Sequence, residues 1–505
     1  MAIVTLVVGL VSACTGGSGA GTNAGNDKPV PGGTLDVGLT IDITSLDPYD
    51  GMGDTTSLVL ANINGQLFKY VDNKMVPALG QGVTRSADGK TATIALRKGA
   101  KFSDGTPITP EDVVFSIQQA KAGANYGSLY KEIIASEKAS GDQVVLTLSR
   151  PTLNLEAMLS IPQASIIPAN FKGKSKGEFF QQPVGAGPYL FSSRQPGVSV
   201  QLKKNPNYWD TGKPYIDTLE FKVFNSNNAL TSAYQAKSIQ AIPFVPTVSV
   251  PTLTGAKIVN TAGAATEMFF INGSKGPLSD LKVRQAISTA IDRETIVKSL
   301  RGPGDKPTET YVPASVLGSA RPASIRRGDI EAAKQLLAAS SYKDGATLKV
   351  IYPTGDDTLA NTVQSMQAEL AKIGIKLDLQ AVDQGVWVND VLAGKYELAY
   401  QNISAHGTTA DAPLQGFIAT KAFGGGWTMD VAKTALTEYQ GAKSTGDQAA
   451  ALDKFQNWIN AELPVIPTVS LSPSLALSGT VAGYQGLETV TQQALPFDGL
   501  WLTGS

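Results

Sequence analysis

Cysteine and histidine are almost absent from this sequence. Cys14 is the single cysteine among 505 residues, so no disulfide can form within the chain. His406 is the single histidine, and one imidazole without neighbouring cysteines or clustered carboxylates makes a poor metal site. A Ser-His-Asp triad would have to use this histidine with Asp411 and a distant serine, and nothing resembles a Gly-x-Ser-x-Gly motif. An exported hydrolase is therefore kept only as an alternative function from another class of protein.

Charge of one sign does not accumulate anywhere in the chain. The sequence has 42 Lys and Arg against 43 Asp and Glu, with no long run of either sign. This balance provides no basic surface for nucleic acid and no footprint for an anionic membrane face. The chain also lacks a Walker loop, so ATP hydrolysis would belong to a separate subunit. These absences favour a small or neutral partner.

Long hydrophobic runs are missing apart from the start of the chain. Ile3–Val11 is apolar but far shorter than the roughly 20 residues that a spanning helix needs. The run is typical of a signal peptide, although no Lys or Arg precedes it, which leaves the true translation start open. The four residues that end in Cys14 resemble the lipobox of bacterial lipoproteins. We expect a signal peptide over residues 1–14 and lipidation of Cys14; the alternative is an unmodified cysteine in a cleaved leader.

The rest of the chain is typical of a globular, turn-rich protein. Its 505 residues exceed the roughly 250 to 300 residues of a single hydrophobic core, so two or more lobes are expected. Hydrophobic residues make up 42% and charged residues 17%, alongside 51 Gly and 28 Pro. Residues 15–31 contain almost nothing apolar and are expected to form a flexible tether in front of this body.

Short strands alternate with helices along the body, which indicates an α/β fold. Apolar residues alternate with others over residues 35–39, 198–202 and 219–223, as in half-buried strands. A helical pattern over residues 359–373 stops at Gly374 and passes directly into a strand.

Capping residues predict where several helices begin. Thr109 is predicted to cap a helix that starts at Pro110, and Asp280 and Asp447 are predicted to cap two later helices. Pro464 is expected to end the last long helix before an apolar strand.

Several motifs follow one another in a characteristic order along the chain. They are Gly32–Leu35, Ser45–Pro48, Leu96–Val113, Pro183–Tyr189, Asn205–Trp209, Val283–Arg293 and Leu463–Pro467. Together they resemble the peptide/nickel family (family 5) of bacterial extracellular solute-binding proteins, the substrate-binding lipoproteins of ABC transporters. Most of these residues can be explained by structure alone; Arg284 and Asp292, for example, can pair on a helix surface. The motifs therefore indicate the fold and not the binding site.

The resemblance implies a two-lobed α/β fold of the periplasmic-binding-protein type (class II, cluster C) with a small inserted domain. The first lobe would comprise residues 32–72, 184–267 and 472–505, the inserted domain residues 73–183, and the second lobe residues 268–471. The hinge is expected near Phe269–Gly273 and Ile466–Leu471, with the ligand between the lobes.

The resemblance also implies a function. Such a protein captures a peptide or peptide-like small solute by hinge closure and delivers it to an ABC permease with separate ATPase subunits. Oligosaccharides, opines and metal chelates are the alternative ligands within the family, and a binding protein that signals instead of feeding an importer also stays open. We expect an exported, lipid-anchored monomer outside the cytoplasmic membrane, with no cofactor, no nucleic acid partner and no enzymatic activity.

The loop after a second-lobe strand is the first candidate for ligand contact. In peptide-binding relatives an Asp in this loop pairs with the ligand's ammonium group. Here the strand is expected at residues 397–401 and the loop at residues 402–411, with Asn402, Ser404, His406 and Thr408 in it. Thr408 stands where relatives carry the Asp, and a neutral residue offers no charge-assisted partner for an ammonium.

Two residues of this loop have alternative interpretations. Asp411 either replaces the missing carboxylate or forms a turn before Ala412-Pro413. His406 is either a ligand for a bound metal chelate or an exposed loop histidine.

Other candidates lie outside that loop. Trp427, which follows three glycines, stacks over a ligand or anchors its loop. Asn272, on the expected hinge, bonds the ligand or ends a strand. Tyr49 and Met52 are candidates for the opposite wall, whereas Trp387 at helical spacing from Val391 is expected in the core.

Overall fold

The structure of the chain, a computed structural model, describes residues 28–503 except for short gaps. The gaps are residues 52, 72–73, 125, 246, 262, 264, 275, 314, 317–327, 405–408, 420–426, 486 and 488–493. Among the predicted site residues, Cys14, Met52, His406 and Thr408 lie outside the described residues. No helix among the described residues combines the length and apolar character needed to cross a membrane.

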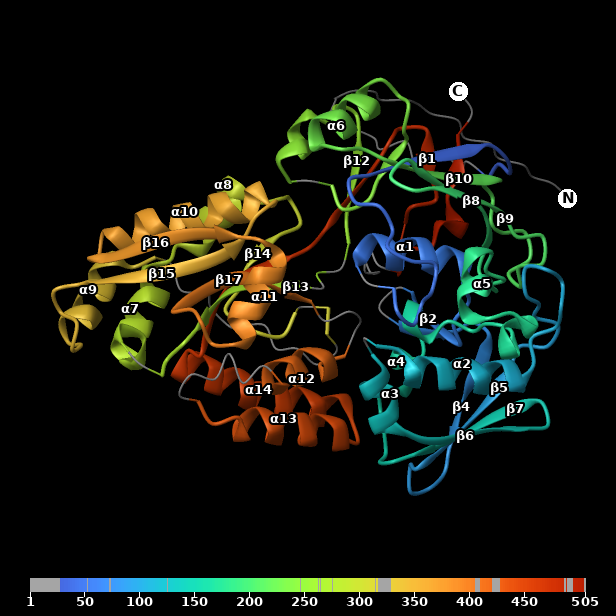
Figure 1. Cartoon of the computed structure of the whole chain (residues 1–505), viewed down its shortest axis with the longest axis horizontal. Helices are drawn as coiled ribbons and strands as arrows, with labels where there is room; N and C mark the ends of the chain where they lie inside the picture. Colours follow the sequence, from blue (N-terminus) through green and yellow to red (C-terminus); the bar gives the residue numbers. More distant parts are fainter. Residues whose placement is uncertain are drawn as a thin grey trace, which may run out of the picture.

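The molecule has two lobes, each built on its own sheet (Figure 1). In the first lobe the strand order is β12-β19-β11-β1-β10-β9-β8. These strands are β1 (Thr34–Leu39), β8 (Tyr189–Gln195), β9 (Ser199–Lys204), β10 (Thr218–Val223), β11 (Ala241–Ile242), β12 (Lys257–Asn260) and β19 (Ser474–Leu477). The helices α1 (Asp54–Ile63) and α6 (Asn227–Gln235) and a short β20–β21 pair (Val481–Ala482 and Trp501–Leu502) complete the lobe.

The strands predicted in the first lobe are present. Leu35 and Val37 of β1 are fully buried, as period-two alternation requires. β1 runs parallel to β10, with Val37 opposite Phe221. Val198 lies just before β9 and is 49% exposed, so that strand begins one residue later than predicted.

The inserted domain contains a third sheet, of order β4-β5-β7-β6. Its strands are β4 (Gly80–Arg85), β5 (Thr91–Leu96), β6 (Ile134–Ser140) and β7 (Gln143–Leu148), preceded by the hairpin β2 (Phe68–Val71) and β3 (Lys74–Pro77). Its helices are α2 (Pro110–Ala122), α3 (Gly127–Ile133), α4 (Leu155–Met158) and α5 (Lys176–Gln181). The predicted cap of α2 is confirmed: Thr109 and Asp112 form a reciprocal capping box.

The second lobe is a six-stranded sheet with helices on both faces, in the order β14-β18-β13-β17-β15-β16. The strands are β13 (Ala265–Ile271), β14 (Lys306–Pro307), β15 (Ala346–Pro353), β16 (Ile375–Val382), β17 (Leu398–Ser404) and β18 (Val465–Leu471). The helices are α7 (Leu281–Ala290), α8 (Arg293–Leu300), α9 (Ile330–Ala338), α10 (Asp357–Ala371), α11 (Gln384–Leu392), α12 (Asp411–Ala419), α13 (Asp430–Gly441) and α14 (Thr445–Glu462).

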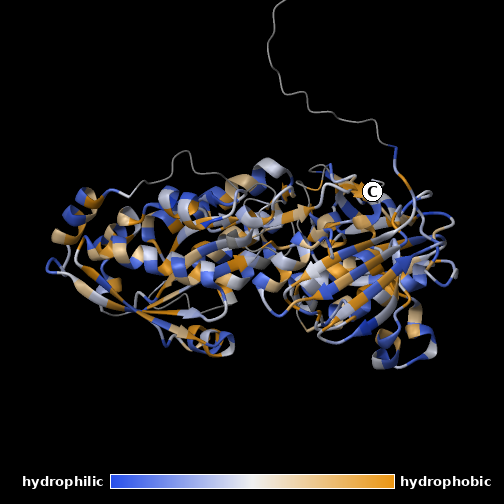
Figure 2. Cartoon of the chain, turned by 90° about the horizontal axis from the view of Figure 1, so that it is seen from above, coloured by the Kyte–Doolittle hydropathy of each residue, from blue (hydrophilic) through white to orange (hydrophobic). Residues whose placement is uncertain are grey.

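Alternate residues of β13 supply the two cores of this lobe. Phe269 and Ile271 pack with α7, α9 and α10, whereas Met268 and Phe270 pack with α11 to α14. Figure 2 shows hydrophobic residues along the strands and more hydrophilic ones on the outer helices. The predicted core position of Trp387 is confirmed, since this residue is 7% exposed and stacks edge-on against Phe270.

Two helix details differ from the sequence prediction. The cap of α14 is Ser444, whose hydroxyl accepts the N–H of Asp447, so Asp447 lies in the first turn. The predicted surface pair of Arg284 and Asp292 is wrong: Arg284 is 3% exposed, and Asp292 instead caps α8.

The chain passes between the two sheets twice, once between β12 and β13 and once between β18 and β19. The predicted hinge at Phe269–Gly273 is wrong, because β13 already belongs to the second sheet; Ile466–Leu471 likewise lies within β18. The predicted lobe boundary after Glu267 also falls inside β13.

The two crossings lie side by side and are hydrogen-bonded to each other. Thr261 donates its N–H and its hydroxyl to Pro473 O, at 2.9 and 2.7 Å, and the Ser472 hydroxyl donates to Thr261 O. Adjacent connections of this kind allow one lobe to rotate against the other about a local axis.

Candidate functional site

A cavity of about 580 Å³ lies where the two lobes meet. The first lobe contributes residues 39–42, 44 and 53–56 together with Pro243 and Phe244, and the second lobe contributes Gln384 and Gln401. The cavity therefore follows the end of β1 and the start of α1 on one side, and β17 and the start of α11 on the other. Its volume falls in the range of small-molecule sites.

The first turn of α1 forms one wall of this cavity. Gly53 precedes the helix with φ of 97°, a conformation that favours glycine, and it offers no side-chain cap. Thr56 in this turn accepts the N–H of Thr44 through its hydroxyl at 3.0 Å, which ties the loop after β1 to the helix. Asp54 places a carboxylate at the positive end of the helix dipole.

Asp42 brings a second carboxylate to the same wall. Its Oδ2 accepts hydrogen bonds from Arg194 Nη2 and Gly197 N, both at 2.9 Å. Burial alone would raise the pKa of Asp42, but these two donors outweigh it and hold the pKa below its ordinary value. Asp42 is therefore ionised at neutral pH, and its charge is balanced by Arg194.

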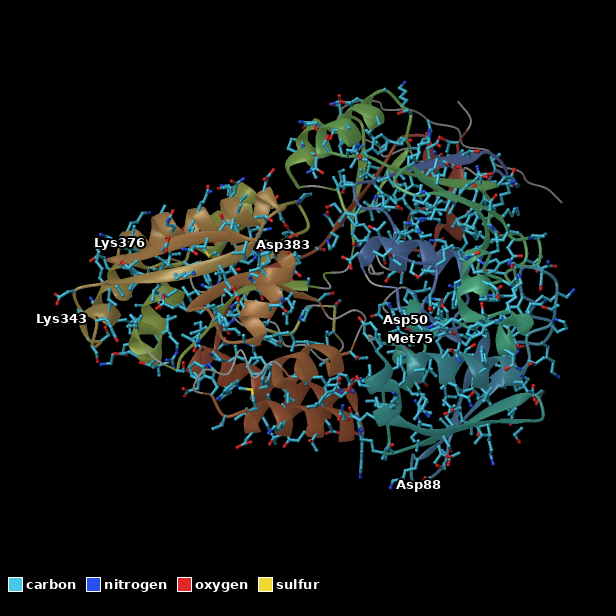
Figure 3. All side chains as sticks on the ribbon, in the orientation of Figure 1. Asp50, Met75, Asp88, Lys343, Lys376 and Asp383 are labelled. Atoms are coloured by element: carbon cyan, nitrogen blue, oxygen red, sulfur yellow. The ribbon has the colours of Figure 1, made fainter. Side chains whose placement is uncertain are left out.

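Two glutamine side chains form the second-lobe wall. Gln401 lies in β17, and Gln384 is the first residue of α11, which Asp383 caps by accepting the Gly385 N–H at 2.8 Å. Gln401 Nε2 donates to Gln384 Oε1 at 3.1 Å, so Gln401 Oε1 and Gln384 Nε2 are not used by this pair. Figure 3 labels Asp383 on the side of the second lobe that faces the first.

Sequence reasoning did not single out the residues of this cavity. The one signal for Gln384 was its position directly after Asp383, a typical capping residue at the start of a helix. Gln401 is the first polar residue of β17, after the buried Leu398, Ala399 and Tyr400, and the strand is only half-buried from there on.

The predicted contact Asn272 lies directly after β13. Its Nδ2 donates to the carbonyl oxygens of Gly394 and Tyr396, at 3.1 and 3.0 Å, and its Oδ1 accepts from Ser274. The side chain is 9% exposed. These contacts hold Asn272 at the end of the strand, and its contact with a ligand stays a prediction.

Tyr49 lies in the core between the first lobe and the inserted domain. It is 2% exposed, and its hydroxyl donates to Ser165 O at 2.8 Å. Its ring packs edge-on against Phe180. The structure therefore uses Tyr49 to join two parts of the chain and does not bring it to the described lining of the interlobe cavity.

Asp411 begins α12 and is 4% exposed. Its Oδ1 accepts a hydrogen bond from Gln440 Nε2 at 2.9 Å. Burial raises the pKa of Asp411, and the bond from Gln440 and the charge of Arg150 oppose this rise. The carboxylate is thus already hydrogen-bonded within the second lobe.

Trp427 packs against the core on the α7 side of the second lobe. The Arg284 guanidinium lies 4.5 Å from the centre of its ring, a cation-π contact. Arg284 also donates to the carbonyl oxygens of Glu462, Leu278 and Ser279. The role of Trp427, as a ligand contact or as a loop anchor, stays a prediction.

Asn402 and Ser404 are both half-buried residues of β17 and lie beyond Gln401 on that strand. The loop was predicted from residue 402, but β17 extends through Ser404. In the pairing with β13, Asn402 is opposite Glu267 and Ser404 is opposite Ala265. Their ligand contacts remain predictions.

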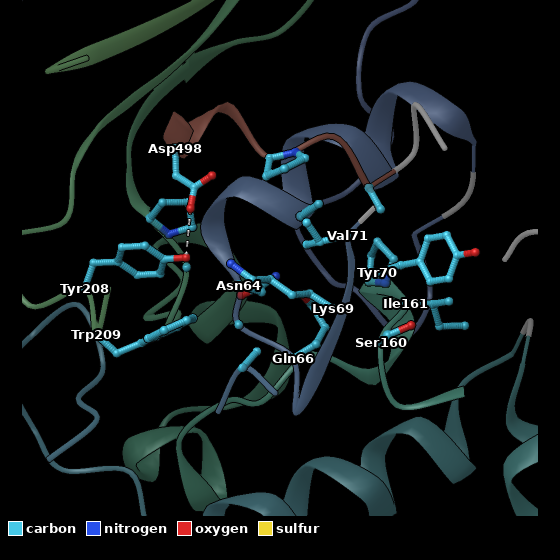
Figure 4. A pocket seen from close by; sticks show the side chains of 18 residues that line it. Asn64, Gln66, Lys69, Tyr70, Val71, Ser160, Ile161, Tyr208, Trp209 and Asp498 are labelled. Atoms are coloured by element: carbon cyan, nitrogen blue, oxygen red, sulfur yellow. Dashed lines mark hydrogen bonds between the residues drawn. The ribbon is translucent and has the colours of Figure 1, made fainter. Parts of the chain in front are cut away.

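A second, smaller cavity of about 90 Å³ lies between the first lobe and the inserted domain (Figure 4). Trp209, Tyr208 and Asn64 line it, and Tyr208 Oη donates to Asp498 at 3.2 Å. Asn64 is 2% exposed, and neither of its amide atoms has a hydrogen-bond partner in the described part of the protein. A space of this size suits a few water molecules and not a peptide.

Among the described residues, no three histidine, cysteine, aspartate or glutamate side chains are grouped so that they could hold a metal ion.

Comparison with known proteins identifies the family. Residues 74–425 match the model described as "Bacterial extracellular solute-binding proteins, family 5 Middle". The chain belongs to this family. The resemblance predicted from the ordered motifs is thereby confirmed, and so is the solute-binding class.

Curated relatives in family 5 extend the match over most of the chain. The glutathione-binding protein GsiB of Salmonella paratyphi A is 28% identical over 428 residues, which cover 82% of this chain and 82% of the relative. GsiB of Escherichia coli O1:K1 is 28% identical over 357 residues, which cover 69% of each chain.

Solved structures confirm the two-lobed α/β fold predicted for a family 5 protein. The substrate-binding protein CtaP of Listeria monocytogenes superposes with a TM-score of 0.84 at 24% identity, over 94% of this chain and 100% of that one. DppA of Helicobacter pylori, in complex with the peptide STSA, superposes with a TM-score of 0.76 at 21% identity. The match covers 94% of this chain and 99% of DppA. AgaA, in complex with agropinic acid, superposes with a TM-score of 0.75 at 24% identity. The match covers 94% of this chain and 99% of AgaA.

Proposed function

We propose that this family 5 protein captures a peptide-like solute in the interlobe cavity and delivers it to an ABC permease. The observation that carries the proposal is the cavity itself, because its lining comes from both lobes. A solute held there touches α1 and the loop after β1 on one side and Gln384 and Gln401 on the other. Such a solute binds the closed arrangement more tightly than the open one and so favours closure.

The chemistry of the cavity suits a peptide-like ligand. Gln384 and Gln401 supply amide donors and acceptors, and the threonines of the first-lobe wall supply hydroxyl groups. A peptide backbone presents the complementary N–H and carbonyl groups. Relatives support this choice, since GsiB is named glutathione-binding and DppA was solved with a tetrapeptide.

The protein's remaining properties follow from delivery to a permease. A receptor must bind and release its ligand unchanged, so we propose no enzymatic activity. Lipidation of Cys14 would hold the protein outside the cytoplasmic membrane, with residues 15–31 as the tether, and the protein would act as a monomer.

Native mass spectrometry of protein purified from its own host tests the ligand class. We expect an added mass that corresponds to a short peptide or a similarly polar amide. An added opine, carbohydrate or metal chelate would overturn the peptide assignment while leaving capture intact.

Alanine substitution of the two glutamines tests the location of the site. Gln401→Ala and Gln384→Ala should each weaken binding of the ligand recovered from the host by about 2- to 10-fold, the effect of one hydrogen bond. Calorimetric titration measures this change. Gln364→Ala, on the exposed face of α10, is the matched control and should bind as the parent does. Unchanged affinity in both cavity variants would place the ligand elsewhere.

A further inference from the structure

The inserted domain touches the second lobe through polar side chains. In Figure 1, α3 and α4 lie beside α12 and α13. Asn154, which precedes α4, donates through Nδ2 to Tyr439 Oη at 3.0 Å. Gln415 of α12 donates through Nε2 to Glu132 Oε2 of α3 at 2.8 Å. Both bonds join parts of the molecule that the hinge allows to move apart.

A third residue of the inserted domain strengthens this contact. Arg150 Nη2 lies 3.2 Å from Glu132 Oε1, so the carboxylate that accepts from Gln415 is held by a guanidinium of its own domain. The positive charge of Arg150 also opposes the rise in the pKa that burial causes at Asp411 of the second lobe.

On the second-lobe side, the contact reaches the start of α12. Tyr439 is 1% exposed, and besides Asn154 its Oη accepts the Ala410 N–H at 3.1 Å. Gln440, the next residue of α13, holds Asp411. The inserted domain is therefore connected through Tyr439 to the residue that directly precedes α12.

We propose that Glu132, Arg150, Asn154, Gln415 and Tyr439 form an interlobe clasp that stabilises the closed arrangement of the lobes. The inserted domain then takes part in ligand capture without touching the ligand. This inference rests on the proposed capture by hinge closure.

The clasp sets how much of the closure must be driven by the ligand. Apparent affinity is reduced by the fraction of molecules that are not in the binding-competent state. One hydrogen bond between the lobes changes the ratio of closed to open molecules by about 2- to 10-fold. Changes at the clasp should therefore alter affinity for every ligand by a similar factor.

Distance measurement without any ligand tests the clasp. In the full chain carrying Cys14→Ala, Lys131→Cys on α3 and Lys433→Cys on α13 provide the two thiols for spin labels; both lysines are exposed. Double electron–electron resonance then reports the separation of the inserted domain and the second lobe. Asn154→Ala and Gln415→Ala should each raise the ratio of long to short distances by about 2- to 10-fold.

Two further variants make the result decisive. Lys454→Ala removes a 2.9 Å contact with Glu438 inside the second lobe, and it should leave the distances unchanged. Tyr439→Phe keeps the buried ring, and combined with Asn154→Ala it should open the molecule little more than either change alone, because both remove one shared bond. Circular dichroism melts check that each variant is folded.

Distance distributions of Asn154→Ala and Gln415→Ala that coincide with the parent would overturn the clasp. Because no ligand is present, this outcome is separate from a failure of the proposed function. If native mass spectrometry finds no bound solute while the distances still shift, the clasp stands and the transport role falls.

Discussion

At the scale of single residues, two glycines explain why the Pro183–Tyr189 motif is structural. This segment packs against the end of α1 with almost no space between the backbones. A Cβ at Gly185 would lie 2.2 Å from Ile63 O, and one at Gly187 would lie 2.6 Å from Ile63 C. Real side chains do not tolerate such distances, so the motif marks a close approach between segments distant in the sequence.

Gly187→Ala should therefore lower the free energy of unfolding by about 1 to 3 kcal/mol, because the backbone of α1 must shift. Denaturant unfolding monitored by fluorescence measures the loss. Gly177→Ala is the matched control: Gly177 lies in α5, an added methyl group there would meet nothing within 4 Å, and this variant should be neutral or slightly stabilising. Equal stability of Gly187→Ala and the parent would contradict the close packing.

At the scale of secondary structure, Asp280 shows how a cap makes stability depend on pH. It caps α7 by accepting the Lys282 N–H, and it also accepts the Ser341 N–H, both at 2.9 Å. The Ser341 N–H lowers the pKa of Asp280 most, burial acts against it, and the Lys282 N–H adds to the lowering below the ordinary 3.8. Because the folded-state pKa is depressed, the stability from this carboxylate is fully present above about pH 4 and is lost as the pH falls through the folded-state value.

Asp280→Ala should thus cost about 1 kcal/mol at pH 7, and the difference from the parent should shrink below about pH 4. Thermal melts between pH 3 and pH 7 check this. Asp344→Ala is the control, since the Asp344 side chain is 92% exposed, and its effect should be small at every pH. A difference that grows on acidification would show the wrong sign for a depressed pKa.

Elements whose signals are local could be predicted from sequence, and contacts between distant segments could not. Thr109 and its capping partner Asp112 are three residues apart, so the cap of α2 was readable. Ser444 and Asp447 are both residue types that typically cap helices. The sequence prediction chose Asp447, whereas Ser444 is the cap. Asn272 and Arg284 each have one backbone partner more than 100 residues away in sequence, at Tyr396 and Glu462. No pattern near either residue revealed that its polar atoms would be engaged by backbone.

At the scale of the whole molecule, the family resemblance predicted the two lobes, whereas only the three-dimensional structure revealed the cavity between them. Gln401 and Asp42 approach one cavity from different lobes, and neither stands out within its own segment. The clasp was hidden for the same reason, since Glu132 and Gln415 are 283 residues apart.

The proposed anchor also acts on the whole molecule. Cys14→Ala should change a membrane-associated protein into a freely soluble one, because acyl chains contribute about 0.8 kcal/mol for each buried methylene. Detergent phase partitioning of cells that express each form measures the change. Ser12→Thr, which keeps the thiol, serves as a control and should remain in the detergent phase. Partitioning of Cys14→Ala with the detergent would refute the anchor.

The position of β19 has a consequence for how the nascent polypeptide acquires its shape. This strand lies between β12 and β11, yet it comprises residues 474–477. While it is still missing, β12 has no neighbour and the first sheet stops at β11. The second sheet, from β13 to β18, is by then fully synthesised. The first sheet can therefore be completed only after every strand of the second sheet has left the ribosome.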